Sequence, residues 1–133
     1  DKGVIVPIAA SLVANGLRVY ATHGTAAHLR EHGVEVTTVY RISENRPPDA
    51  LGLMRRGEIR LVINTPTSSS GARRDGYMMR RLAIDLGIPF ITTIRGAAAA
   101  AAAIAEVRSA QLAVKSLQAF AAENRLMARS RAA

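Results

Sequence analysis

The chain has 133 residues, 49% of them hydrophobic, which suits one globular domain large enough to bury a core. It contains no cysteine, and this excludes a disulfide framework and any thiolate metal site. The formal net charge of +8, carried mostly by arginine, favours an anionic partner: a nucleotide, a phosphate or a nucleic acid.

Several other classes of protein fit less well. Nucleic acid is the weaker interpretation of the charge, because the arginines are spread over many segments and only 4% of the residues are aromatic. No apolar run approaches the roughly 20 residues of a membrane span, and no signal peptide is visible. We therefore expect a cytoplasmic protein that contacts no membrane. His28 and His32 are spaced for a metal pair, but we expect both to face solvent and no metal to bind.

The first part of the chain alternates helical and extended patterns. Apolar residues recur at helical spacing from about Val4 until Asn15-Gly16, which predicts a helix. A strand over residues 17–21 follows, and then a helix over residues 26–32. Valines at three positions within residues 34–39 predict a second strand, because β-branched residues favour extended backbone.

The segment between the first strand and the second helix is Ala21-Thr22-His23-Gly24-Thr25. The unpaired N–H groups and the dipole at a helix start favour an anion, and Gly24 lets the backbone approach a ligand closely. Thr22 and Thr25 add hydroxyl donors, so this segment is a candidate anion site. The alternative is that Thr25 only caps the helix and Gly24 only makes a turn.

A charged, proline-rich loop is predicted over residues 41–48. Its Arg41 and Arg46 are either candidates for holding an anion or solvated loop residues. Asp49 is expected to cap a short helix that Gly57 closes. The apolar run over residues 59–63 then predicts a strand of a parallel sheet, buried on both faces.

Polar residues follow that strand directly, at Asn64, Thr65 and Thr67. Ligands of open α/β sheets bind at the carboxyl ends of the strands, which is where these residues lie. Asn64 can both donate and accept hydrogen bonds, and this suits a base edge or a ribose better than a phosphate. The alternative is that Asn64 and Thr65 only stabilise their own turn.

The last third of the chain continues the alternation. A loop is predicted over residues 68–71, a helix from Asp75 to Gly87, and a strand over residues 89–93. An alanine run over residues 97–103 predicts a helix that can lie close to a sheet, and a helical pattern continues over residues 109–125. The whole chain therefore predicts an α/β fold of three layers, α/β/α, with a parallel sheet and no second domain.

An ordered set of segments resembles a known family. The segments are Asp1-Lys2, Ala21-Thr22-His23-Gly24-Thr25, Arg46-Pro47, Ile63-Asn64-Thr65-Pro66-Thr67, Arg73-Arg74-Asp75-Gly76-Tyr77 with Arg80-Arg81, and Ile88-Pro89 with Thr92-Thr93. Together they resemble the methylglyoxal-synthase-like domain, a Rossmann-like fold, at the C-terminus of the carbamoyl phosphate synthetase large subunit. The resemblance covers residues 1–120 and leaves residues 121–133 as a C-terminal tail.

The resemblance implies a regulatory domain with no catalytic residue of its own. Domains of this family bind an allosteric effector, typically uridine monophosphate or inosine monophosphate. One set of residues would contact the effector phosphate: Lys2, Thr22, Gly24, Thr25 and Arg41, the last standing where the family usually has lysine. A second set would face the nucleoside: Asn64, Thr65 and Thr67.

The resemblance also implies a parent enzyme. This is a glutamine-hydrolysing ligase that uses ATP with Mg or Mn to make carbamoyl phosphate for the pyrimidine and arginine pathways. The regulatory domain would hold no cofactor, and its further partners would be the other domains of the large subunit and the glutaminase small subunit. The family has a first, central strand before its Asp-Lys pair that is missing here, so we expect the natural protein to continue upstream of Asp1.

Two related enzymes and one binding module are the alternatives. Methylglyoxal synthase releases phosphate from dihydroxyacetone phosphate and needs a carboxylate base, but Asn64-Thr65-Pro66 has none at the expected position. An inosinate cyclohydrolase would have Thr-Gly-Gly-Thr in place of Thr22-His23-Gly24-Thr25. A basic module for nucleic acid would bind with a steep salt dependence. Should no nucleotide bind, N-acetylglutamate is the next effector we expect.

Overall fold

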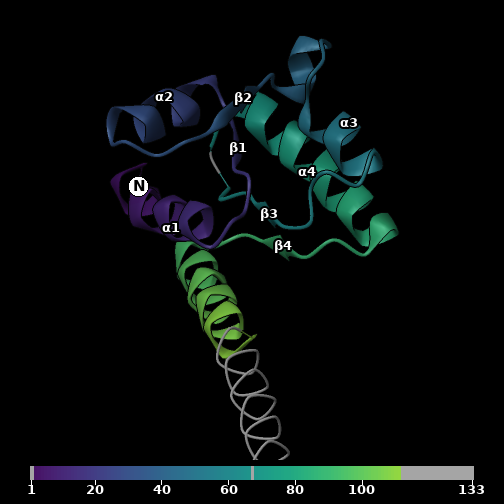
Figure 1. The fold of residues 1–133 in the computed structure, drawn as a ribbon. Coiled ribbons are helices and arrows are strands. Elements are labelled where there is room, and N and C mark those ends of the chain that lie inside the picture. Colours follow the sequence, from purple (N-terminus) through teal and green to yellow (C-terminus); the bar gives the residue numbers. More distant parts are fainter. Residues whose placement is uncertain (1, 67, 112–133) are drawn as a thin grey trace, which may run out of the picture.

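The computed structural model describes residues 2–66 and 68–111, which alternate helix and strand along the chain (Figure 1). The elements are α1 (Lys2–Ala14), β1 (Tyr20–Thr22), α2 (His23–Glu31), β2 (Thr37–Val39), the 3-10 helix η1 (Ile42–Glu44), α3 (Ala50–Arg55), β3 (Val62–Ile63), α4 (Ser70–Leu86) and β4 (Phe90–Ile91). Residues 94–111 form a further helix, called here the C-terminal helix. Thr67, the domain boundary at residue 120 and the tail over residues 121–133 lie outside the described residues.

The strands pair in parallel, as predicted. β1 pairs with β2, so that Tyr20 lies opposite Thr37, and β3 pairs with β4, so that Val62 lies opposite Phe90. Each pair is a sheet of two strands, so within the described residues the parallel sheet is present as two separate pieces. Because paired parallel strands end at the same edge, the loops that follow β1 and β2 emerge together. The predicted α/β class with parallel strands is confirmed.

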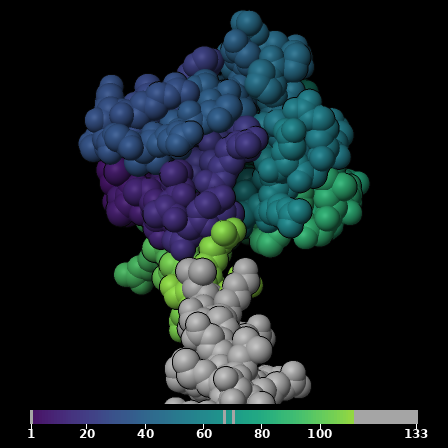
Figure 2. Space-filling view, viewed as in Figure 1, coloured from purple at the N-terminus to yellow at the C-terminus, as the bar shows by residue number. Residues whose placement is uncertain are grey.

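The helices flank the two strand pairs. α1 and α2 lie beside β1 and β2, whereas α3 and α4 lie beside β3 and β4 (Figure 1). In the space-filling view the purple and blue surface of the first elements lies next to the teal surface of the later ones, and the C-terminal helix leaves the body at one end (Figure 2). The domain is therefore built from two α/β halves in chain order.

Helix α1 packs on two neighbours at once. Its Ala9 lies in one cluster with Leu29 of α2, which is only 1% exposed. Its Ile8 lies in a second cluster with Ala97 and Ala101 of the C-terminal helix, and Ile63 of β3 packs against the same cluster. The alanine run therefore forms the helix that was predicted, and its small side chains allow a close approach to α1.

A third cluster of buried side chains lies between α3 and α4. Leu51 and Met54 of α3 pack with Ala83 of α4 and with Val62 of β3. Met54 is 1% exposed and Ala83 is fully buried. The unbranched methionine side chain packs between the two helices and β3. This cluster fixes α4 next to the segment that follows β3.

The strands are shorter than the apolar patterns predict. Only residues 20–22, 37–39, 62–63 and 90–91 form ladders, against predictions of five or six residues each. The reason is that apolar periodicity reports burial, and burial does not require strand pairing. Val34, for example, is buried in the core although it precedes β2 by several residues.

Helices begin earlier than predicted, most clearly α2 and α4. α2 begins at His23 and not at Ala26, so Gly24 lies in its first turn and Thr22 is its N-cap residue. α4 begins at Ser70, so the helix start predicted at Asp75 is wrong, and only residues 68 and 69 of the predicted loop over 68–71 lie outside the helix. Asp75 is a typical capping residue, but here it is buried in the middle of α4 and accepts a hydrogen bond from the Ser43 hydroxyl at 3.4 Å.

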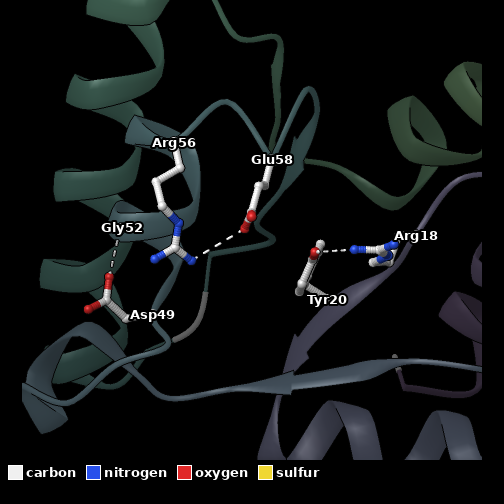
Figure 3. A network of polar contacts seen from close by, with 6 residues as sticks. All are labelled: Arg18, Tyr20, Asp49, Gly52, Arg56 and Glu58. Carbon is white, nitrogen blue, oxygen red and sulfur yellow. Dashed lines mark hydrogen bonds and ion pairs between the residues drawn. The ribbon is translucent and has the colours of Figure 1, made fainter.

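The predicted caps of the other helix ends are confirmed. The Gly52 N–H donates to Asp49 Oδ1 at 2.9 Å, so Asp49 caps α3 (Figure 3). Gly57 follows α3 with a φ of +75°, and Gly87 ends α4 with a φ of +68°. Both glycines adopt the left-handed conformation, which is unfavourable for residues that have a Cβ atom.

Replacing Leu29 by alanine should lower the free energy of unfolding by about 2–5 kcal/mol, because a buried side chain is lost and a cavity remains. The matched control is Ile84→Ala, since Ile84 on α4 is 74% exposed. Urea unfolding followed by circular dichroism measures both variants. Equal losses in the two variants would contradict the assignment of Leu29 to the core.

Asp49→Ala should lower the free energy of unfolding by about 1 kcal/mol, because one N–H group of α3 loses its acceptor. Asp49→Asn should be nearly neutral, since asparagine caps a helix as well as aspartate does. Thermal unfolding of the two variants at equal pH measures the difference. A loss in Asp49→Asn as large as that in Asp49→Ala would show that the carboxylate does more than cap α3.

Candidate functional site

The candidate phosphate site lies where β1 passes directly into α2. Thr22 is the last residue of β1 and the N-cap residue of α2, but its side chain makes no capping hydrogen bond. Thr25 is half-buried in the first turn of α2. The alternative in which Thr25 caps the helix and Gly24 makes a turn is therefore wrong. The first N–H groups of α2 have no partner within the helix, which is the arrangement that favours an anion.

Lys2 lies over the start of α2. A Cβ atom added at Gly24 would stand 3.6 Å from Lys2 Nζ, so the ammonium group faces the first turn of the helix. Lys2 is the first residue of α1, and the contact between α1 and α2 brings the two helix starts together. The structure thus brings Lys2 to the segment 22–25, although the two are far apart in sequence.

The Lys2 ammonium group near this segment forms no ion pair with a carboxylate within the part of the chain that the structure describes. There, the one ion pair joins Arg56 to Glu58 at 3.3 Å, and both side chains are largely exposed (Figure 3). It lies between α3 and β3, before the strand, and so away from the carboxyl end of β1. The positive charge of Lys2 and of the start of α2 is available to an anion.

Contacts of the Tyr40 ring bring Tyr40 and Arg46 to this site. His23, the first residue of α2, places its ring 5.3 Å from that of Tyr40 in an edge-to-face arrangement. The Cζ atom of Arg46 lies 4.1 Å from the centroid of the same Tyr40 ring. The sequence interpretation named Arg46 but missed Tyr40. The position of Tyr40 directly after β2, at the same edge as the segment 22–25, is the signal that could have found it.

Arg41 is not brought to the segment 22–25 by any described contact. Its backbone N–H donates to Glu44 Oε2 at 2.6 Å, which stabilises the turn of η1, and its side chain is exposed. The assignment of Arg41 to the phosphate therefore stays a prediction.

Asn64 follows β3 and is held between two elements. Its N–H donates to the Ile91 carbonyl at 2.9 Å, which extends the pairing of β3 with β4. Its side chain lies against α4, since a Cβ added at Gly76 would stand only 2.5 Å from Asn64 Nδ2. Thr65 is half-buried beside it. The absence of a side chain at Gly76 is what leaves room for the Asn64 amide.

Two further pairs of polar side chains, His28 with His32 and Arg18 with Tyr20, are not part of the candidate phosphate site. His32 Nδ1 lies 2.8 Å from the His28 carbonyl, and the two rings are 4.5 Å apart. His28 is half-buried with a buried Nε2, so the prediction that it faces solvent is wrong, whereas His32 is exposed. In residues 2–66 and 68–111 no three side chains are grouped so as to hold a metal ion.

The second polar pair joins Arg18 to Tyr20. A hydrogen bond from Arg18 to the Tyr20 hydroxyl raises the pKa of Arg18, which stays charged (Figure 3).

The comparisons with known proteins decide the family. The model of the MGS-like domain matches residues 4–92, which is more than half of the chain. The chain belongs to the MGS-like domain family. The resemblance found in the sequence is thereby confirmed.

Curated relatives of this MGS-like domain carry one name. The chain is 50% identical over 117 residues to "Carbamoyl phosphate synthase large chain, C-terminal section" from Methanopyrus kandleri, covering 88% of this chain and 21% of the relative. The protein of that name from Methanocaldococcus jannaschii is also 50% identical over 88% of this chain and 19% of its own length. "Carbamoyl phosphate synthase large chain" from Methanosarcina acetivorans is 43% identical over 90% of this chain and 11% of its own. The chain thus spans about a fifth or less of these relatives.

No helix of the MGS-like domain, within the residues described, is long and apolar enough to cross a membrane.

In this MGS-like domain, Gly76→Ala should displace the Asn64 side chain while leaving stability nearly unchanged. The added methyl would meet Asn64 Nδ2 at 2.5 Å, but alanine favours a helix over glycine by up to about 1 kcal/mol. The side-chain amide resonance of Asn64 in an NMR spectrum measures the displacement.

The matched control for this variant is Gly71→Ala, also in α4, where an added Cβ would meet nothing within 4 Å. It should leave the Asn64 amide resonance in place. An unmoved Asn64 resonance in Gly76→Ala would contradict the packing of Asn64 on α4.

Proposed function

We propose that this MGS-like domain is the allosteric regulatory part of a carbamoyl phosphate synthase large chain. Its similarity to proteins named as the C-terminal section of that chain supports this role. The parent would be a glutamine-hydrolysing ligase of the cytoplasm that uses ATP with Mg or Mn and serves pyrimidine and arginine synthesis. The regulatory domain would contact the other domains of the large chain and, through them, the glutaminase small subunit.

The effector in this proposal is a nucleoside monophosphate, uridine monophosphate or inosine monophosphate. The observation that carries it is the placement of Lys2 Nζ over Gly24 at the start of α2. An ammonium group, unpaired helix N–H groups and the hydroxyls of Thr22 and Thr25 together supply the charge and the donors that a phosphate dianion requires. The effector phosphate would bind there, and Arg41, in the loop after β2, stays a predicted further contact.

The nucleoside would extend toward the end of β3. Asn64 offers both a donor and an acceptor, and Thr65 and Thr67 offer hydroxyls, which suits a ribose or the edge of a base. The Asn64 side chain is fixed against Gly76, so it would present its polar group in one orientation. A fixed amide can distinguish one base from another, because an unpaired buried polar group is costly.

Catalysis as a methylglyoxal synthase is the weaker proposal for this site. That reaction needs a free carboxylate to remove a proton. Asp49 is engaged as the cap of α3, and Asp75 is buried in α4 with Ser43 as its partner. Asn64 stands where the synthase pattern would have a carboxylate.

Regulation requires that the effector distinguish two conformations of the large chain. An effector shifts an equilibrium only by its difference in affinity for the two states. Binding at the start of α2 would order the loops that follow β2 and β3, and the change would pass to neighbouring synthetase domains.

Thr25→Ala should weaken binding of the nucleotide about tenfold, because a hydrogen bond to a charged phosphate is lost. Isothermal titration of uridine monophosphate and of inosine monophosphate into the wild type and the variant measures the effect. Thr37→Ala is the control, since Thr37 is exposed at the start of β2, at the opposite end of the strands. Nucleotide binding that is equal in all three proteins would contradict the phosphate site, and no binding to folded wild type would contradict the nucleotide effector.

A further inference from the structure

The Tyr40 ring contacts both His23 and Arg46. None of these three residues belongs to the set predicted to bind the effector phosphate. The guanidinium carbon of Arg46 lies 4.1 Å from the centroid of the Tyr40 ring, within the range of a cation–π interaction. A second contact of the Tyr40 ring is with the His23 ring, at a centroid distance of 5.3 Å and an interplanar angle of 62°. The Tyr40 ring therefore joins the loop over residues 41–48 to the start of α2.

The position of these contacts places Arg46 beside the candidate phosphate site. His23 is the first residue of α2 and directly follows Thr22. Tyr40 directly follows β2, which is paired with β1 along residues 20–22, so both residues lie at the same edge of the strand pair. Arg46 reaches this edge through the ring of Tyr40, although its own loop is exposed.

Arg46 and Arg41 are in different situations within the same loop. Arg41 belongs to the turn of η1, where its N–H is held by Glu44, and no described contact joins it to α2. Arg46 has its flat guanidinium on an aromatic face and forms no ion pair with a described residue. A planar guanidinium has five N–H donors, and stacking on a ring leaves its edges available to a phosphate.

We propose that Arg46 is an additional anion-contacting residue of the effector site and that Tyr40 is its positioning residue. The inference rests on the proposed function, since it requires an anion at the start of α2. Stacking on Tyr40 restricts the long Arg46 side chain before any ligand arrives, so less conformational entropy is lost on binding. The His23 ring contacts the Tyr40 ring edge to face from the start of α2.

The test compares two arginine variants of equal charge by titration with inorganic phosphate and with uridine monophosphate. Arg46→Ala should weaken phosphate binding about tenfold, because a charge-assisted hydrogen bond is removed. Arg60→Ala removes the same charge from an exposed side chain that precedes β3, at the amino ends of the strands. It should weaken phosphate binding less than about twofold, since only screened long-range attraction is lost.

The positioning role of Tyr40 is tested by a double-mutant cycle. Tyr40→Phe keeps the aromatic face and should bind phosphate as the wild type does, whereas Tyr40→Leu should bind severalfold more weakly. In an Arg46→Ala background, Tyr40→Leu should cause no further loss of affinity, because it acts through Arg46. An equal loss in both backgrounds would overturn the positioning role and leave Tyr40 a merely structural residue.

The outcomes separate this inference from the proposed function. Equal effects of Arg46→Ala and Arg60→Ala on phosphate, with nucleotide binding retained, would overturn the role of Arg46 and leave the nucleotide effector standing. Phosphate binding that depends on Arg46, without any nucleotide binding, would support Arg46 and overturn the nucleotide effector. A folded wild-type protein that binds neither phosphate nor nucleotide would overturn both.

Discussion

The two-sided packing of α1 is the contact on which the rest of the domain depends. On one side Ala9 of α1 shares a cluster with α2, and on the other Ile8 and Leu12 share a cluster with the C-terminal helix. Ile63 of β3 and Ile91 of β4 pack against the second of these clusters, so α1 also connects the two strand pairs, which have no described ladder between them. Burial of one such aliphatic side chain is worth about 1.5–3 kcal/mol. Because α1 begins at Lys2, the same packing sets where the ammonium group lies.

Sequence patterns predicted which helices and strands form better than they predicted the residues at which these elements begin and end. The sequence located every α-helix and strand of the described residues but predicted a loop where the 3-10 helix η1 lies, and cap chemistry correctly predicted the roles of Asp49, Gly57 and Gly87. Sequence patterns and cap chemistry are both local signals, so they survive without knowledge of the fold. The start of α4 was predicted too late, at Asp75, which is buried inside the helix and accepts a hydrogen bond from the Ser43 hydroxyl, a tertiary contact that no local pattern reports.

The candidate site, too, could be predicted from the sequence only in part. The segment 22–25 could be found from sequence because a strand, a glycine and hydroxyl residues occur in one short stretch. The approach of Lys2 to Gly24 was implied by the family resemblance alone, since it depends on how α1 and α2 pack. The stacking of Arg46 on Tyr40 could not be predicted, because no sequence spacing reports which ring a loop arginine will cover. The sequence gives no reason to distinguish Arg41 from Arg46, because their different contacts arise only in the folded loop.

The Lys2 ammonium group near the start of α2, which forms no ion pair with a described carboxylate, also has a thermodynamic consequence. An anion that binds Lys2 and α2 in the folded domain, and does not bind the unfolded chain, adds RT ln(1 + [L]/Kd) to the free energy of unfolding. At an anion concentration of 100 times Kd this amounts to about 2.7 kcal/mol, a large share of the stability of an ordinary domain. The lifetime of such a domain in the cell, and not only the activity it regulates, would then follow the supply of its anion.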